Sequence, residues 1–343
     1  MITSERVSRI LSAVVQDYIQ TAEPVSSKTI SRKYPLGLSP ATIRNIMAEL
    51  EEDGFLRQPH TSAGRVPTEK GFRFYVDSLP KLEDLAEGEK DIIRRSCGAP
   101  CAMENILADT AKALSALTGC AGLMFAPRKD SFTIKHIRIL PMDSASLMVL
   151  LVSSIGLVQT RLVRMDSGVK GLDLEKISNY LNSIAWGLTV RELRLRIIKE
   201  MRVEKNLYDK LMAKALNLGV MAFEDGAVAQ EGDIYVEGKV NVFEQPEFRD
   251  DFERMKRLFD AFEEKSLLVK ILDKSMDSGG IHIYLGSESA VEEFRGLSFV
   301  TAPYGRDGEI LGTLGVIGPV RMNYSRIIPL VDYTAGLLSK VFY

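Results

Sequence analysis

Residues 41 to 45 carry side chains that suit recognition of base edges in duplex DNA. Asn45 can pair with an adenine through its carbonyl and amide groups together, and Arg44 can reach a guanine edge or a phosphate. The small side chains of Ala41 and Thr42 suit contact with a thymine methyl group. Because bases are read by hydrogen bonds and apolar contacts made side by side, this run predicts a DNA-reading surface.

A helix over residues 39–53 would place these side chains together on its outer face. Ser39 is a favourable N-cap, and Pro40 occupies the first helical position, where its missing N–H costs nothing. Gly54 is placed to end the helix. The opposite face is an apolar stripe with helical spacing, formed by Ile43, Ile46, Met47 and Leu50.

Charge is distributed unevenly along this helix. The outer face of its first two turns carries only Arg44, whereas its end is the acidic run from Glu49 to Asp53. Negative charge at a helix C-terminus opposes the helix dipole, so helix stability does not explain this run. The pattern favours a helix that enters the major groove by its N-terminus, because its acidic end then stays away from the phosphates. The alternative is an ordinary surface helix with a solvated acidic face.

The neighbouring segments predict further elements of one small domain. Helical spacing continues from Val7 to Tyr18, and a short second helix is expected to begin at Ser26 or Ser27. After Gly54, two short strands are expected around a polar turn at 60–64. Three helices followed by a hairpin are typical of a winged helix-turn-helix DNA-binding domain, here residues 1–80. Such a domain can also bind protein in place of DNA.

Further DNA contacts are expected beside the reading helix. Helix N-termini bind phosphates through N–H groups and hydroxyls, which favours Ser26, Ser27 and Lys28. In the predicted wing, Gly64 permits a close approach and Arg65 suits a phosphate or the minor groove. The complete predicted contact set is Ser26, Ser27, Lys28, Ser39, Ala41, Thr42, Arg44, Asn45, Thr61, Ser62, Gly64 and Arg65.

Composition indicates a globular protein without an overall basic field. The 343 residues are 45% hydrophobic and 26% charged, with a formal net charge of −2, which suits two or three ordinary domains. Residues 1–79 hold ten Lys and Arg against nine Asp and Glu, a net charge of +1. DNA contact must therefore depend on local placement of charge. Three scattered cysteines and the lack of a long apolar run predict a cytoplasmic protein that does not enter a membrane.

Motifs for catalysis or cofactor binding are weak in this sequence. Cys97 and Cys101 form a CxxxC with few histidines available, which makes a poor zinc site. The three glycines at 312, 315 and 318 lie in a strand pattern and not between a strand and a helix, so they do not indicate a nucleotide site. The polar loop around 273–280 has no ligand geometry. We therefore expect no enzyme activity and no cofactor.

The remainder of the chain predicts an α+β architecture. An apolar helix at 103–118 precedes several strands, of which the third is apolar enough to be central and buried. Helices then dominate until strands resume near the C-terminus. The predicted strands are 121–127, 132–142, 146–154, 156–165, 281–286, 297–303 and 309–319; a hairpin is expected at 233–244, and helices at 173–186, 190–201, 203–218, 246–264 and 324–342.

The segment PVSSKTISRKYPLGLSPATIRNIMAELEEDGFLRQPHTSAGRVPTEKGFRFYVD resembles the start of the HrcA family of heat-inducible transcription repressors. The most specific pieces are the SPATIRN-MAELE-GFL helix and the HTSAGR-P wing. The resemblance extends over the whole chain, more weakly in its middle. It implies a linker at 81–102, a GAF-like domain formed by 103–171 and 263–343, and an inserted dimerising domain at 172–262.

The resemblance also implies a function. A homodimer would bind an inverted-repeat operator, the CIRCE element, and repress chaperone operons. The chaperonin GroEL would help the repressor reach its active form, and heat would divert GroEL to unfolded proteins. One alternative is a ligand-sensing winged-helix regulator with an effector in the GAF-like domain. Another is an enzyme or a protein-binding scaffold, which DNA affinity without salt dependence, or no DNA affinity at all, would favour.

Overall fold

The computed structural model describes most of the chain, and its contacts divide the chain into two compact units. We call residues 5–79 the helical module and the rest of the first unit the central sheet domain. Residues 133–203, in the second unit, form the insert. The described residues are 5–60, 63–79, 84–98, 103–125, 133–154, 158–164, 173–203, 234–249, 251–276, 280–289, 291–306 and 309–341.

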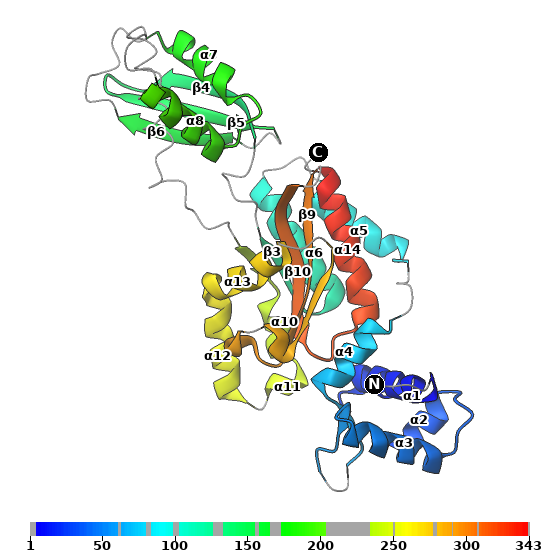
Figure 1. The fold of residues 1–343 in the computed structure, drawn as a ribbon. Coiled ribbons are helices and arrows are strands. Elements are labelled where there is room, and N and C mark those ends of the chain that lie inside the picture. Colours follow the sequence, from blue (N-terminus) through cyan, green and yellow to red (C-terminus); the bar gives the residue numbers. More distant parts are fainter. Residues whose placement is uncertain are drawn as a thin grey trace. The chain divides into compact units, whose positions relative to one another are not determined.

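The helical module contains four helices and a two-stranded antiparallel hairpin among its described residues (Figure 1, blue). These elements are α1 (Glu5–Thr21), α2 (Ser27–Lys33), α3 (Pro40–Glu52), β1 (Leu56–Arg57), β2 (Val66–Pro67) and α4 (Glu69–Asp77). The predicted caps are confirmed, since Ser26 and Ser39 each accept a backbone N–H at 3.1 Å. Gly54 follows α3 with a φ of +76°. The buried residues of α3 are the four of the predicted apolar stripe.

One face of helix α4 packs into the core of the helical module. Thr68 caps it by accepting the N–H of Gly71 at 3.2 Å. Phe72 packs against Tyr18 of α1, with ring centroids 6.2 Å apart, and Tyr75 is buried. Because these aromatic contacts tie α4 to α1, the four helices form one packed body.

The central sheet domain is built on a five-stranded sheet with the order β7-β3-β10-β9-β8. β3 pairs antiparallel with β10 on one side and with β7 on the other, so distant parts of the chain meet in one sheet. The glycine run at 312–318 lies within β10, as predicted. The strands are β3 (Ala121–Phe125), β7 (Ile234–Glu237), β8 (His282–Leu285), β9 (Leu297–Arg306) and β10 (Glu309–Pro319).

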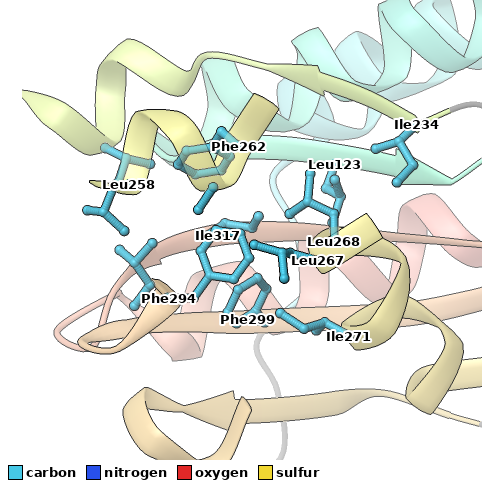
Figure 2. Close-up of a cluster of buried hydrophobic side chains, with 14 of the residues drawn as sticks. Leu123, Ile234, Leu258, Phe262, Leu267, Leu268, Ile271, Phe294, Phe299 and Ile317 are labelled. Atoms are coloured by element: carbon cyan, nitrogen blue, oxygen red, sulfur yellow. The ribbon is translucent and has the colours of Figure 1, made fainter. Parts of the chain in front are cut away.

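Helices cover both faces of this sheet (Figure 1). On one face, Leu123 belongs to a buried cluster that includes Phe262, Phe294 and Phe299 (Figure 2). On the other face, a Cβ at Gly122 would lie 2.0 Å from the carbonyl oxygen of Ala111. Only glycine therefore lets the helix that contains Ala111 approach the sheet this closely. The first layer is α10 (Lys239–Phe243), α11 (Pro246–Arg249), α12 (Phe252–Glu263) and α13 (Lys265–Met276); the second is α5 (Glu87–Cys97), α6 (Met103–Thr118) and α14 (Tyr324–Val341). Two 3₁₀ turns, η2 (Gly286–Ser289) and η3 (Glu292–Phe294), follow β8.

The insert is a three-stranded antiparallel sheet with two helices on one face. β5 is its central strand, as its apolar run predicts. Asn182 fixes a helix to the sheet, because its side chain both accepts from Ile137 N–H and donates to the Ile137 carbonyl at 2.7 Å. The elements are β4 (Ile134–Pro141), β5 (Ser146–Ser153), β6 (Val158–Arg164), α7 (Leu174–Ala185) and α8 (Val190–Val203).

Within the described residues, the second face of this small sheet stays uncovered. Leu162 is 62% exposed and Val158 58% exposed. The row across the sheet is apolar, because Leu140 pairs with Met148, which pairs with Leu162. The insert therefore carries an apolar sheet face that the described helices do not bury.

The domain borders differ from the prediction. The predicted GAF-like domain includes β4, β5 and β6 together with the C-terminal strands, but these three strands form a separate sheet. The described part of the insert begins at residue 133 and not at residue 172, and the chain returns to the central sheet at β7 and not at residue 263. Periodicity identifies a strand but not its partners, because pairing is decided between distant segments. Helix α5 occupies much of the predicted linker 81–102 and buries Ile93 and Cys97.

The predicted hairpin at 233–244 is also wrong. Its first strand is β7, but Lys239–Phe243 is helix α10, which begins after Gly238 with a φ of +72°. Val240 and Val242 alternate as in a strand, although Val242 is buried and Val240 is 62% exposed on a single helical turn. The predicted helix at 246–264 is divided into α11 and α12, and that at 203–218 lies outside the described residues.

Candidate nucleic-acid interface

The first two turns of α3 leave the predicted base-reading side chains at the surface. Ala41, Arg44 and Asn45 are exposed, and Thr42 is half-buried. The hydroxyl groups of Ser39 and Thr42 lie 2.9 Å apart, and Ser39 also accepts the Thr42 N–H. The cap therefore fixes the start of the helix while its polar tip remains accessible.

The start of α2 carries the predicted phosphate-binding residues, and α2 packs against α3 (Figure 1). Ser26 and Lys28 are exposed, and Ser27 is half-buried. The end of α2 is held by an ion pair of 2.6 Å between Lys33 and the buried Asp17 of α1. The structure thus brings the predicted phosphate-binding and base-reading positions together on two packed helices.

In the hairpin, the two described members of the predicted contact set, Gly64 and Arg65, make contacts within the module. Arg65 is 20% exposed and forms an ion pair with Glu51 of α3, at 2.7 Å from Nε to Oε2. A Cβ at Gly64 would lie 2.4 Å from the carbonyl oxygen of Val25, so the glycine is required by a contact within the module. Thr61 and Ser62 lie outside the described residues.

The predicted contact set does not include one exposed cation of the hairpin. Arg57 is exposed on β1 beside the buried Leu56, and it pairs across the hairpin with Val66. Alternation of a buried and an exposed position in this two-residue strand was the signal that could have revealed it. Arg57 adds an exposed positive residue to the described part of the hairpin.

The acidic end of α3 is only partly compensated. The Lys70 ammonium donates to the Asp53 carbonyl at 2.7 Å and lies 4.2 Å from the centre of the Phe55 ring. A cation at this position favours the negative end of the helix dipole. Glu49, Glu52 and Asp53 remain exposed, so the two ends of α3 differ in charge as the sequence predicts.

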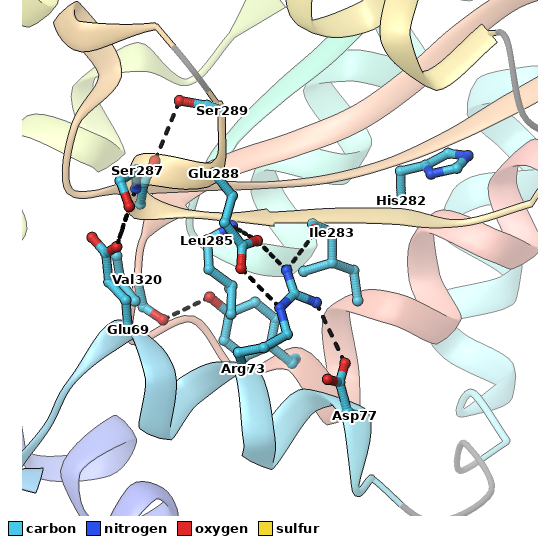
Figure 3. A network of polar contacts seen from close by, with 12 residues as sticks. Glu69, Arg73, Asp77, His282, Ile283, Leu285, Ser287, Glu288, Ser289 and Val320 are labelled. Carbon is cyan, nitrogen blue, oxygen red and sulfur yellow. Dashed lines mark hydrogen bonds and ion pairs between the residues drawn. The ribbon is translucent and has the colours of Figure 1, made fainter. Parts of the chain in front are cut away.

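The module contacts the central sheet domain through the polar side of α4 (Figure 3). Arg73 forms an ion pair with Glu288 and donates to the Ile283 carbonyl at 2.7 Å, and Glu69 accepts the Ser287 hydroxyl at 2.6 Å. Burial raises the pKa of Glu288, but hydrogen bonds from Arg73 and from the Leu285 N–H outweigh it and leave this pKa lowered. The carboxylate is thus held in its charged form.

Comparison with known proteins defines the class to which this chain belongs. A protein from Geobacter sulfurreducens named heat-inducible transcription repressor HrcA is 44% identical over 339 residues, 98% of each chain. One of the same name from Syntrophobacter fumaroxidans is 43% identical and aligns over 98% of this chain and 97% of its own. The relatives are transcription repressors and not enzymes.

The particular family follows from the same comparisons. The family model described as HrcA protein C terminal domain matches residues 104–328. The chain therefore belongs to the HrcA family, and the predicted resemblance is confirmed. A crystal structure described as a hypothetical protein shares the fold, with a TM-score of 0.65, 22% identity and coverage of 99% of this chain and 98% of that one. No helix among the described residues is long and apolar enough to cross a membrane.

Proposed function

We propose that this chain represses heat-shock genes by reading operator DNA with a winged helix-turn-helix, which we assign to the helical module. The observation that carries this proposal is the exposed, nearly uncharged tip of α3, where Ala41, Arg44 and Asn45 lie opposite a buried apolar stripe. A recognition helix contacts base edges through its N-terminal residues, and these three offer the chemistry that such contacts need.

Phosphate contacts would set the register of this helix. Ser26 and Lys28 at the start of α2 and Ser39 at the start of α3 are exposed beside backbone N–H groups. Such groups bind phosphates without reading sequence. Arg57 is a further exposed cation for this purpose. Base reading and positioning would thus come from different residues of one module.

Operator binding would require a homodimer. One recognition helix makes few base contacts, and two half-sites of an inverted repeat, the proposed CIRCE element, increase the discrimination. The uncovered face of the insert supports a dimerising role, because an apolar row of Leu140, Met148 and Leu162 suits burial against a second copy. We assign dimerisation to this face.

Two further assignments rest on family likeness. We assign a GAF-like role to the central sheet domain, and we propose that the chaperonin GroEL helps the repressor reach its active form. Both proposed partners, DNA and chaperonin, are cytoplasmic, so we place the protein there.

The test is binding of purified protein to a duplex that carries the inverted repeat, against a scrambled duplex of equal length. Binding to the repeat should be tighter by several orders of magnitude, and both affinities should fall with increasing salt. Equal affinity for the two duplexes would remove the assignment of base readers. Binding that does not depend on salt would overturn the DNA-binding proposal itself.

A further inference from the structure

The carboxylate of Glu51 joins α3 to the residues next to both strands of the hairpin, Gln58 after β1 and Arg65 before β2. Its Oε1 atom accepts the backbone N–H of Gln58 at 3.0 Å, and its Oε2 atom lies 2.7 Å from Arg65 Nε. Gln58 in turn donates from its side chain to the Ala63 carbonyl at 3.0 Å, across the turn of the hairpin. One carboxylate therefore contacts the two chain segments that must stay together for the hairpin to keep its shape.

Arg65 is fixed from the other side as well. Its backbone N–H donates to the Val25 carbonyl at 2.9 Å, and its carbonyl accepts the Val25 N–H at 2.8 Å. The close approach of Gly64 to the same residue brings the hairpin against the loop before α2. The Nε atom of Arg65 is buried and makes the ion pair without a hydrogen bond of good geometry. The guanidinium is thus directed toward Glu51 within the module.

These contacts distinguish Glu51 from the other acidic residues at the end of α3. A carboxylate close to DNA ordinarily weakens binding, because it repels the phosphates. Glu51 is 32% exposed and has two partners in the hairpin, whereas its neighbour Glu52 is exposed. The two adjacent acids therefore differ in their surroundings although they have the same charge.

We infer that Glu51 is a positioning residue for the wing, and that Arg65 acts through Glu51 rather than by binding a phosphate. This inference rests on the proposed DNA binding by the helical module. The ion pair and the Gln58 hydrogen bond hold the hairpin at a fixed angle to α3. The wing then meets the DNA backbone already ordered, which lowers the entropy lost on binding.

The decisive experiment compares Glu51→Ala with Glu52→Ala in the full chain, on the duplex that carries the inverted repeat. Glu51→Ala should weaken binding by about three- to tenfold, the scale of a partly exposed ion pair and a few ordered side chains. Glu52→Ala should leave affinity unchanged or raise it slightly, because it only removes a negative charge. Loss in the first variant and not in the second supports the inference. Equal or tighter binding by both variants overturns it.

Salt dependence separates the two roles for Arg65. If Arg65 bound a phosphate, Arg65→Ala would reduce the slope of log affinity against log salt by about 1. A positioning role predicts an unchanged slope, and the Glu51→Ala/Arg65→Ala double variant should lose no more affinity than either single variant. A reduced slope together with additive losses would overturn the inference and restore Arg65 as a direct contact.

Hydrogen exchange provides a measurement that does not depend on DNA. The Gln58 amide should exchange about tenfold faster in Glu51→Ala and at the wild-type rate in Glu52→Ala, since local opening sets exchange. Glu51→Gln, which keeps an acceptor for Gln58 but loses the charge, serves if the alanine variant does not fold. Unchanged exchange in Glu51→Ala contradicts the inference, and so does wild-type affinity for the inverted repeat in Glu51→Gln, which has lost the charge that pairs with Arg65. Failure of the wild type to bind DNA would instead contradict the proposed function.

Discussion

The helical module and the insert are small bodies that leave opposite kinds of surface exposed. In the helical module, α3 buries its apolar stripe. In the insert, the three-stranded sheet buries the face that α7 and α8 cover. The exposed remainder of α3 is polar at its tip, with Arg44 and Asn45, whereas that of the sheet is apolar, with Leu162. A polar tip that fits a groove suits nucleic acid, and an apolar sheet face suits another protein surface.

This difference shows which residues can be changed without damage to the fold. Exposed residues of either surface contribute little to their own core, so their substitution should affect a partner and not stability. The comparison therefore predicts that changes in the insert alter assembly and changes in the module alter DNA binding.

The largest effect is expected from Leu162→Asp in the insert. A charge in the apolar row should prevent its burial against a second copy, and loss of the second half-site should weaken operator binding by about 100-fold or more. Sedimentation of the full chain measures the assembly. Leu195→Asp is the matched control, because Leu195 is 60% exposed on α8 rather than on the open sheet. A Leu162→Asp dimer would place the interface elsewhere.

Arg44→Ala in the module should have the next largest effect. If Arg44 pairs with a guanine, the change should cost about 1–3 kcal/mol on the inverted repeat and much less on a scrambled duplex. Titration of both duplexes at one salt concentration measures the difference. Equal losses on both would make Arg44 a phosphate contact, and no loss would remove it from the interface.

A smaller and uniform effect is expected from Lys28→Ala. A phosphate contact carries no sequence information, so affinity should fall alike on all duplexes and the salt slope should decrease by about 1. Titrations at several salt concentrations test this. Arg32→Ala, at the other end of the same helix, is the control. A sequence-dependent loss in Lys28→Ala would contradict the separation of positioning from reading.

Local rules made most of the module predictable from sequence. The cap at Ser39, the stripe that includes Ile43 and the stop at Gly54 depend only on near neighbours, and all three are confirmed. The surroundings of Arg65 could not be predicted in this way. Its partner Glu51 lies in another element, and the contact exists only once the hairpin has folded back onto α3.

The insert was less predictable for the same physical reason. The strand at Ser146–Ser153 was recognised by its apolar run, yet its sheet partners depend on contacts between distant segments. In the central sheet domain, the short helix Lys239–Phe243 resembles a strand in sequence, because two valines at alternate positions fit either structure. Gly238 between them and β7 was the residue that could have corrected this interpretation.

The smallest effect is expected where the module meets the central sheet domain, at the ion pair of Glu288 with Arg73 (Figure 3). Because the folded-state pKa of Glu288 is lowered, its contribution to stability is present above the pKa of the unfolded chain and is lost as pH falls through the folded-state pKa. Glu288→Gln should therefore flatten the decrease in stability as pH falls below about 5, measured by urea unfolding. The Glu288 side chain is 38% exposed, so solvent screening keeps the difference below about 1 kcal/mol.

Glu292→Gln is the control for this measurement, since Glu292 pairs with Arg295 on its own turn and is 81% exposed. Its unfolding should follow the wild-type pH profile closely. If the two variants gave the same profile, the contact between α4 and the η2 turn would add nothing measurable to stability. The attachment of α4 to the central sheet domain would then have to come from its apolar contacts.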